Sequence, residues 1–254
     1  MAKQGIHEEV EYINGNGDAI VFIHGILGSP GQFRFLAVEL FKKGFDCISL
    51  LLPGHGGSAK MFYQTPCGKW AEYVKQRIDE VAKKYKRVVL VGHSLGGLLC
   101  LDYAASSDVA GIVLINTPLA FKISPKQLAI SMKILFSCAD SDDELHSGYR
   151  AAFSVSNGRI YEYPLWLRQF IGLVFIIQRS RKRLKDVRAA TLIIQSAKDE
   201  SVYRRSAALL SASLVNTHSQ LLYLEHSYHG YFPPDDRKTL VEAISKFMSS
   251  QAVK

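Results

Sequence analysis

The sequence predicts an α/β fold, with a mostly parallel sheet flanked by helices and a helical cap inserted into it. Short apolar runs alternate with segments whose apolar residues recur at helical spacing, as expected for parallel strands joined by crossover helices. This rhythm stops after Pro118 and returns at Ala190, which indicates an insertion in an otherwise continuous domain. A glycine-rich turn at Gly92 joins one apolar run directly to a helical pattern.

The predicted elements follow one another at the spacing of strand–helix–strand units. Apolar runs too short for helices are read as buried strands, and apolar residues three and four apart mark helices. The predicted strands are 19–23, 45–51, 88–91, 111–116, 190–195 and 220–225, with 6–13 as an edge strand or hairpin arm. The predicted helices are 33–41, 70–85, 95–106, 202–214 and 235–250.

The predicted domain division places residues 1–118 and 188–254 in the core and 119–187 in the cap, after a sixth strand. Within the cap, residues 125–136 and 164–184 are expected to be helical. The stretch Leu165–Ile177 is strongly apolar but too short to span a membrane, and Arg168 interrupts it. Two interpretations follow: a cap helix packed on the core, or a lid that also makes transient contact with a lipid surface.

Composition bounds the class of protein. The chain has 254 residues, of which 48% are hydrophobic and 21% charged, and suits one large domain. Its four cysteines fit no metal spacing, and the N-terminus shows no signal peptide, so a cytoplasmic protein is expected. The net charge of +8 comes partly from residues 179–185; without a nucleic-acid motif there, a solvated helix face is favoured and no nucleic-acid partner is expected.

The turn after residues 88–91 carries the pattern Gly-x-Ser-x-Gly, with Ser94 at its centre. A serine on a sharp strand-to-helix turn has a strained backbone that lifts its hydroxyl clear of the sheet. Gly92 and Gly96 leave room for that turn. The N–H of Leu95 then lies at a helix N-terminus, where it can face a developing oxyanion. Ser94 is therefore the candidate nucleophile; the alternative is an N-cap serine in an ordinary turn.

A nucleophilic serine needs a general base and a carboxylate that orients it. Asp199 lies in the loop after strand 190–195, at the edge where a parallel sheet presents its active-site loops, and Glu200 is the alternative carboxylate. His229 lies deep in the loop after the last strand and is the candidate base. His226 is the alternative, although it follows that strand closely.

Two further histidines are poorly placed to act as the base. His218 precedes the last strand and so lies on the wrong edge of the sheet. The side chain of His93 is expected to point into the sheet rather than at Ser94.

The second oxyanion donor should come from the loop His24–Gly28, with the N–H of Ile26 first and that of Leu27 second. His24 is expected to hold this loop by hydrogen bonding.

The chain resembles the α/β-hydrolase superfamily, and within it the small bacterial carboxylesterases and monoacylglycerol-lipase-like enzymes. The matching residues are His24-Gly25, Pro53-Gly54-His55-Gly56, Gly92-His93-Ser94-Leu95-Gly96-Gly97, Asp199 and His229. The resemblance implies the α/β-hydrolase fold. It also implies a nucleophile, acid and base in the chain order Ser94, Asp199, His229.

The resemblance implies hydrolysis of a small-molecule carboxylic ester through an acyl-enzyme, with no metal or organic cofactor. Amidase or peptidase, thioesterase, C–C hydrolase and acyltransferase chemistry on the same triad stay open, as does a ligand receptor on the hydrolase fold. Ser94 argues against dehalogenase chemistry, which uses a carboxylate nucleophile. The loop His24-Gly25-Ile26-Leu27-Gly28 differs from the His-Gly-Gly-Pro-Gly of proline iminopeptidases. The protein is expected to be a monomer or a homodimer.

Overall fold

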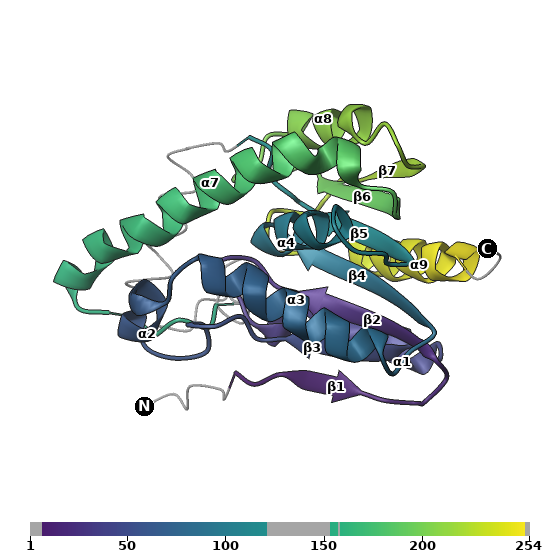
Figure 1. The fold of residues 1–254 in the computed structure, drawn as a ribbon, viewed down its shortest axis with the longest axis horizontal. Coiled ribbons are helices and arrows are strands. Elements are labelled where there is room, and N and C mark those ends of the chain that lie inside the picture. The colour runs from purple at the N-terminus through teal and green to yellow at the C-terminus, as the bar shows by residue number, and fades with distance from the viewer. Residues whose placement is uncertain (1–6, 121–152, 157, 252–254) are drawn as a thin grey trace.

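A seven-stranded sheet forms the centre of the molecule (Figure 1) in a computed structural model that describes residues 7–120, 153–156 and 158–251. The strand order is β1-β3-β2-β4-β5-β6-β7. Within the described residues only the pairing of β1 with β3 is antiparallel, and every other neighbouring pair is parallel. The strands are β1 (Val10–Tyr12), β2 (Asp18–Ile23), β3 (Asp46–Leu50), β4 (Arg87–His93), β5 (Gly111–Ile115), β6 (Ala190–Ser196) and β7 (Ser219–Leu224). The predicted α/β-hydrolase fold and mostly parallel sheet are confirmed.

The central strands are continuous apolar runs because both faces of the sheet are covered. Successive side chains of a strand point to opposite faces, and β4 shows this clearly. Val88 and Leu90 belong to the core on one face, whereas Val89 and Val91 belong to the core on the other. All four are buried. Packing on both faces therefore fixes the position of β4, and its end places the residues that follow it.

Helices cover the two faces of the sheet. On one face, α1 (Arg34–Lys42), entered through the short helix η1 (Pro30–Phe33), packs beside α9 (Pro234–Ser250). On the other face lie α3 (Gly68–Ala82), α4 (Leu95–Ala104) and α8 (Arg205–Ser213). The short helix α2 (Ala59–Gln64) was not predicted; the Ser58 side chain caps it by accepting from the Met61 N–H at 3.2 Å.

The segment between β5 and β6 breaks the strand–helix rhythm as expected. Its described part contains η2 (Ile160–Trp166), α7 (Leu167–Arg183) and η3 (Leu184–Asp186), in agreement with the helix predicted at 164–184. The helix predicted at 125–136 lies outside the described residues, and the division into core and cap stays a prediction. Among the described residues the insertion follows the fifth strand rather than a sixth, because a single short strand, β1, precedes β2.

Helix α7 lies on the same side of the sheet as α4. The C-terminal part of α7 contacts α4 (Figure 1). One face of α7 is buried and includes Leu173 and Ile177. The opposite face exposes large apolar side chains, from 41% to 65% of their surface: Leu167, Phe170, Ile171, Val174 and Phe175. Among the described residues, no helix has the length and hydrophobicity that crossing a membrane requires.

Candidate active site

Ser94 lies at the junction of β4 and α4, in the conformation that the motif predicts. Its φ of 52° and ψ of −115° are unfavourable for a residue with a side chain, and such strain is concentrated at functional sites. The backbone N–H of Ser94 donates to the carbonyl of Ile115 over 2.9 Å, which anchors the turn to β5. A Cβ on Gly96 would lie 1.8 Å from the carbonyl oxygen of Ile23, so only glycine fits there.

The loop after β2 supplies the other candidate oxyanion donor. Among the described residues, the backbone N–H groups of Ile26 and Leu95 have no hydrogen-bond acceptor. The N–H of Leu27, the second candidate, donates to Nε2 of His55 over 3.1 Å and is therefore occupied. Leu27 also has a positive φ of 62°. The free N–H groups make Ile26 and Leu95 the better pair of donors.

Two buried histidines hold this loop in place. His24 donates from Nδ1 to the carbonyl of Gly25 over 2.8 Å and accepts the N–H of Leu52 at Nε2 over 3.0 Å. His55 uses Nδ1 to donate to the carbonyl of Pro53, which leaves Nε2 to accept from Leu27. Burial lowers the pKa of His55 to about 4 and that of His24 well below its usual value. Both rings are therefore neutral supports, and the structural role expected for His24 is confirmed.

The carboxylate of Asp199 faces the ring of His229. Its Oδ2 accepts from Nδ1 of His229 over 2.9 Å, and its Oδ1 accepts the backbone N–H groups of Ser201 and Val202, each over 2.8 Å. Glu200 accepts the backbone N–H of His229 at 3.3 Å instead of the ring. The structure therefore pairs Asp199, not Glu200, with the imidazole.

Charge determines how this pair titrates. Burial alone raises the pKa of Asp199 and lowers that of His229, but mutual attraction and their hydrogen bond outweigh burial. The pKa of Asp199 is therefore below its usual value and that of His229 is above 6.5, with Glu200 adding to the upward shift. A carboxylate beside Nδ1–H also leaves Nε2 as the basic nitrogen of neutral His229.

The alternative histidines lie in unsuitable places. His226 is exposed, and its backbone N–H donates to Asp236 over 3.0 Å, so it belongs to the start of the loop. His218 is exposed and immediately precedes β7, at the opposite edge of the sheet from His229. Of the three histidines considered as the general base, His229 is therefore the one whose ring faces Asp199.

Sequence reasoning missed a hydrogen-bond network beneath the site. The Gln32 side chain accepts the N–H of Gly25 over 3.2 Å and contacts Nδ1 of His93 at 2.9 Å. His93 in turn donates from Nε2 to the carbonyl of His229 over 2.7 Å, and Asn116 Nδ2 donates to the same carbonyl over 2.9 Å. This network connects the loop His24–Gly28, the strand-to-helix turn at Ser94 (the elbow) and the loop after β7 that carries His229.

Only Asn116 carried a local signal that could have revealed the network. It ends the apolar run of β5 and has a positive φ of 48°, a conformation that asparagine tolerates better than most residues. Gln32 and His93 are 61 residues apart in the chain, and His93 and His229 are 136 apart. Hydrogen bonds over such separations leave no periodic pattern in a sequence.

The structure brings together some of the predicted site residues more closely than others. Asp199 and His229 are hydrogen-bonded, and the rings of His93 and His229 lie 4.7 Å apart between centroids. The hydrogen bonds of the described residues do not include one from the Ser94 hydroxyl to His229. In enzymes without substrate such contacts are often long and shorten on binding. In the described part of the chain, no cluster of three or more His, Cys, Asp or Glu side chains could hold a metal ion.

Comparison with known proteins shows the family of the chain. Residues 20–243 match the Alpha/beta hydrolase family. The chain belongs to the α/β-hydrolase family. It is similar to the thermostable monoacylglycerol lipase of Bacillus sp. (strain H-257), with 21% identity over 95% of this chain and 94% of that lipase.

Solved structures share the fold of this α/β hydrolase. The structure reported for LipS and LipT, two metagenome-derived lipolytic enzymes, covers 97% of this chain and 98% of its own, with a TM-score of 0.78 and 22% identity. The monoacylglycerol lipase of Paleococcus ferrophilus gives a TM-score of 0.72 at 18% identity, over 96% of this chain and 98% of that lipase. The superposition extends over nearly the whole length of each protein.

Proposed function

We propose that this α/β hydrolase cleaves carboxylic esters through Ser94, Asp199 and His229. The observation that carries the proposal is the 2.9 Å hydrogen bond from Nδ1 of His229 to the buried carboxylate of Asp199. The loop of His229 is in turn hydrogen-bonded to His93, the last residue of the strand before Ser94. A buried carboxylate on Nδ1 fixes the tautomer and stabilises the imidazolium that forms in the reaction. Membership of the family and the strained Ser94 support the same conclusion.

The reaction has two stages. Nε2 of His229 takes the proton of the Ser94 hydroxyl, and the serine oxygen attacks the ester carbonyl carbon. The N–H groups of Ile26 and Leu95 stabilise the oxyanion until the carbon–oxygen bond breaks. The alcohol leaves with the proton from His229. Water then gives a proton to His229 and attacks the acyl-enzyme, which releases the acid and restores Ser94.

The similarity to monoacylglycerol lipases over 94% and 98% of their lengths favours esters of fatty acids as the substrate class. A panel of p-nitrophenyl esters from acetate to palmitate, with monoacylglycerols, tests this. Matched amides and thioesters in the same panel test the alternative chemistries. We expect Ser94-dependent turnover of esters with a preference for medium or long acyl chains. Preferred turnover of an amide or a thioester would move the protein to that class.

The exposed apolar face of α7, formed by Leu167, Phe170, Ile171, Val174 and Phe175, supports contact with a lipid surface as part of the same proposal. Arg181 and Lys182, the exposed basic residues at the end of α7, are suited to anionic headgroups, whereas Arg183 is paired with Asp102. Co-sedimentation with vesicles containing phosphatidylglycerol tests the contact. We expect binding that Phe175→Asp weakens and that a matched change of a polar exposed residue, Gln178→Asp, weakens less. Equal recovery of both variants with the vesicles would contradict lipid contact.

A further inference from the structure

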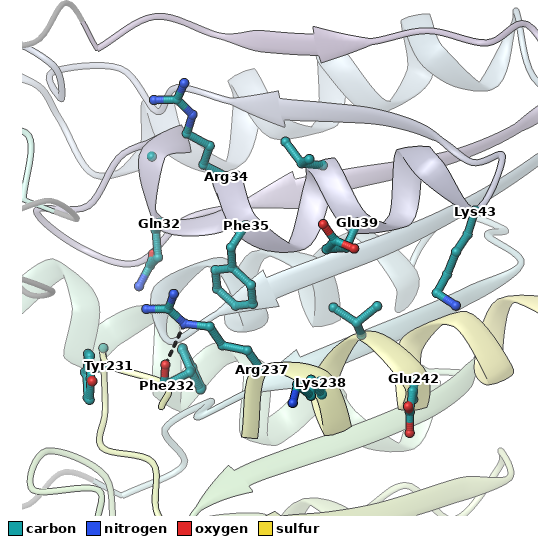
Figure 2. A pocket seen from close by; sticks show the side chains of 14 residues that line it. Gln32, Arg34, Phe35, Glu39, Lys43, Tyr231, Phe232, Arg237, Lys238 and Glu242 are labelled. Atoms are coloured by element: carbon teal, nitrogen blue, oxygen red, sulfur yellow. Dashed lines mark hydrogen bonds between the residues drawn. The ribbon is translucent and has the colours of Figure 1, made fainter. Parts of the chain in front are cut away.

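A cavity of about 750 Å³ lies between α1 and α9, on the face of the sheet opposite α4 (Figure 2). Its volume is within the range of small-molecule sites. One end of the cavity is formed by the segment Gly230–Phe232, which directly follows His229. The middle is apolar and includes Val38 of α1 and Val241 of α9. The candidate active site does not use this space.

Arg237 is held in a fixed position at the end near His229. Its Nε–H donates to the carbonyl of Phe232 over 2.6 Å, and its guanidinium carbon lies 5.0 Å from the centre of the Phe35 ring. Figure 2 shows the guanidinium beside that ring. The two terminal amino groups of Arg237 have no acceptor among the described residues. An oriented guanidinium with both amino groups free matches the two oxygens of a carboxylate.

The charges around the cavity also favour an anion. Four basic side chains line it, against two acidic ones: Arg34, Lys43, Arg237 and Lys238, against Glu39 and Glu242. Glu39 is already paired with Lys42 over 2.7 Å, and Lys238 with Asp235 over 3.7 Å, which leaves Arg34, Lys43 and Arg237 against Glu242. The surface between the charged groups is apolar, so a ligand that is charged at one end and aliphatic along its length fits both features.

We propose that this cavity binds a medium-chain monocarboxylate, with its carboxylate on Arg237 and its aliphatic chain between α1 and α9 over Val38 and Val241. Phe35 fixes the arginine from one side and offers an apolar surface to the first carbons of the chain. The site is separate from Ser94, so binding does not require ester hydrolysis.

Binding in the cavity has a direct route to the candidate active site. Gln32 lines the cavity and also bonds the N–H of Gly25 and the ring of His93. Gly230, which lines the same cavity, is covalently joined to His229. A bound carboxylate therefore changes the turnover rate, and this consequence rests on the proposed function.

Calorimetric titration of the full chain with decanoate tests the site, with four proteins compared. Arg237→Gln removes the charge, and Val38→Trp fills the cavity while leaving Arg237 in place. Arg204→Gln is the matched control, because Arg204 also stacks on an aromatic ring, 4.2 Å from the centre of Tyr223, but does not line the cavity. We expect the decanoate Kd to rise at least tenfold in both cavity variants and to stay within twofold in the control.

Decanol and decyltrimethylammonium are titrated in parallel, and we expect each to bind at least tenfold more weakly than decanoate. Equal decanoate affinity in the wild type and in both cavity variants would overturn the proposal, as would equal affinity for decanol. If Arg237→Gln fails to fold, Val38→Trp carries the same comparison. Ester turnover is measured separately, so its absence would reject the proposed function and leave the binding result intact.

Discussion

The Nε2–H of His93 donates a hydrogen bond over 2.7 Å to the backbone carbonyl of His229. His93 is the last residue of β4 and immediately precedes Ser94. The residue next to the candidate nucleophile therefore positions the loop of the candidate base. Burial lowers the pKa of His93 to about 3, so the ring stays neutral and can keep accepting from Gln32 at Nδ1.

Removal of this hydrogen bond should impair turnover more than substrate binding. In His93→Ala the backbone carbonyl of His229 keeps only the hydrogen bond from Asn116, and we expect kcat to fall about tenfold with little change in KM, roughly the effect of one buried hydrogen bond. His93→Gln restores an amide N–H and should recover part of the loss. Steady-state kinetics and Tm are measured for both variants. Equal kcat in His93→Ala and wild type would refute the positioning role.

The pH dependence of turnover should report the pKa of His229. The base must be neutral to accept a proton, and Asp199 and Glu200 hold its pKa above 6.5. We therefore expect kcat/KM to rise with pH through a midpoint above 6.5. Glu200→Gln removes one of the two negative charges and should lower the midpoint while kcat stays within a few-fold. Glu225→Gln, an exposed carboxylate at the start of the same loop, should leave the midpoint unchanged.

Asp199→Asn removes the carboxylate that contributes more than Glu200 to the raised pKa of His229, and with it the charged acceptor on Nδ1. The pKa of the buried His229 then falls, and kcat should drop by about four orders of magnitude, as in other triads. The pH profile and single-turnover rates of this variant give both quantities. A near-normal kcat would assign the orienting role to Glu200.

Buried neutral histidines should make the fold sensitive to acid. In the unfolded chain His55 titrates near 6.5, but in the folded protein near 4, so the unfolded state binds more protons between these values. Its contribution is complete above pH 6.5 and is lost as the pH falls through about 4, amounting to about 3 kcal/mol. His24 and His93 act in the same direction. His229 contributes to the free energy of unfolding in the opposite direction, because its pKa is raised in the folded protein. Its contribution is complete at low pH and is lost as the pH rises.

Urea unfolding at several pH values between 7 and 4.5 measures this dependence. The free energy of unfolding of the wild type should fall with pH, and His55→Gln should show a shallower slope because one linked proton is gone. Identical slopes for the two proteins would show that His55 is not the linked group.

Gly96 in the elbow and Gly68 at the start of α3 should differ sharply in how well they tolerate an added Cβ. In Gly96→Ala the new Cβ meets the Ile23 carbonyl at 1.8 Å, and we expect a loss of more than about 2 kcal/mol of unfolding free energy. Gly68→Ala, at the start of α3, meets nothing within 4 Å and should stay within about 1 kcal/mol of the wild type. Chemical unfolding of the two variants makes the comparison, and equal losses would contradict the packing argument.

Local patterns in the sequence predicted the parts of this structure that depend on neighbouring residues. The apolar run ending at Gly92, the strained Ser94 and the helix after it follow from residue types within one short stretch. The loop positions of Asp199 and His229 follow from the ends of two strands. These features are fixed by strand length and turn geometry, which sequence patterns report directly.

Contacts between segments far apart in the chain could not be predicted from local sequence patterns. The N–H of Leu27 is occupied by His55, which is 28 residues away, so the choice between Ile26 and Leu27 required the fold. The network through Gln32, His93 and Asn116 depends on the ends of β4 and β5 meeting the short helix η1 at one edge of the sheet. Neither hydrophobic periodicity nor turn chemistry specifies which polar side chains meet there.

The most direct test of the central claim is mass spectrometry of the protein after rapid mixing with a p-nitrophenyl ester. The proposed reaction predicts a transient mass increase equal to the acyl group, located on Ser94 by peptide mapping and absent from Ser94→Ala. Release of about one equivalent of p-nitrophenol before steady turnover should accompany it. Ester turnover that persists in folded Ser94→Ala, or an acyl group found on a different residue, would contradict the account.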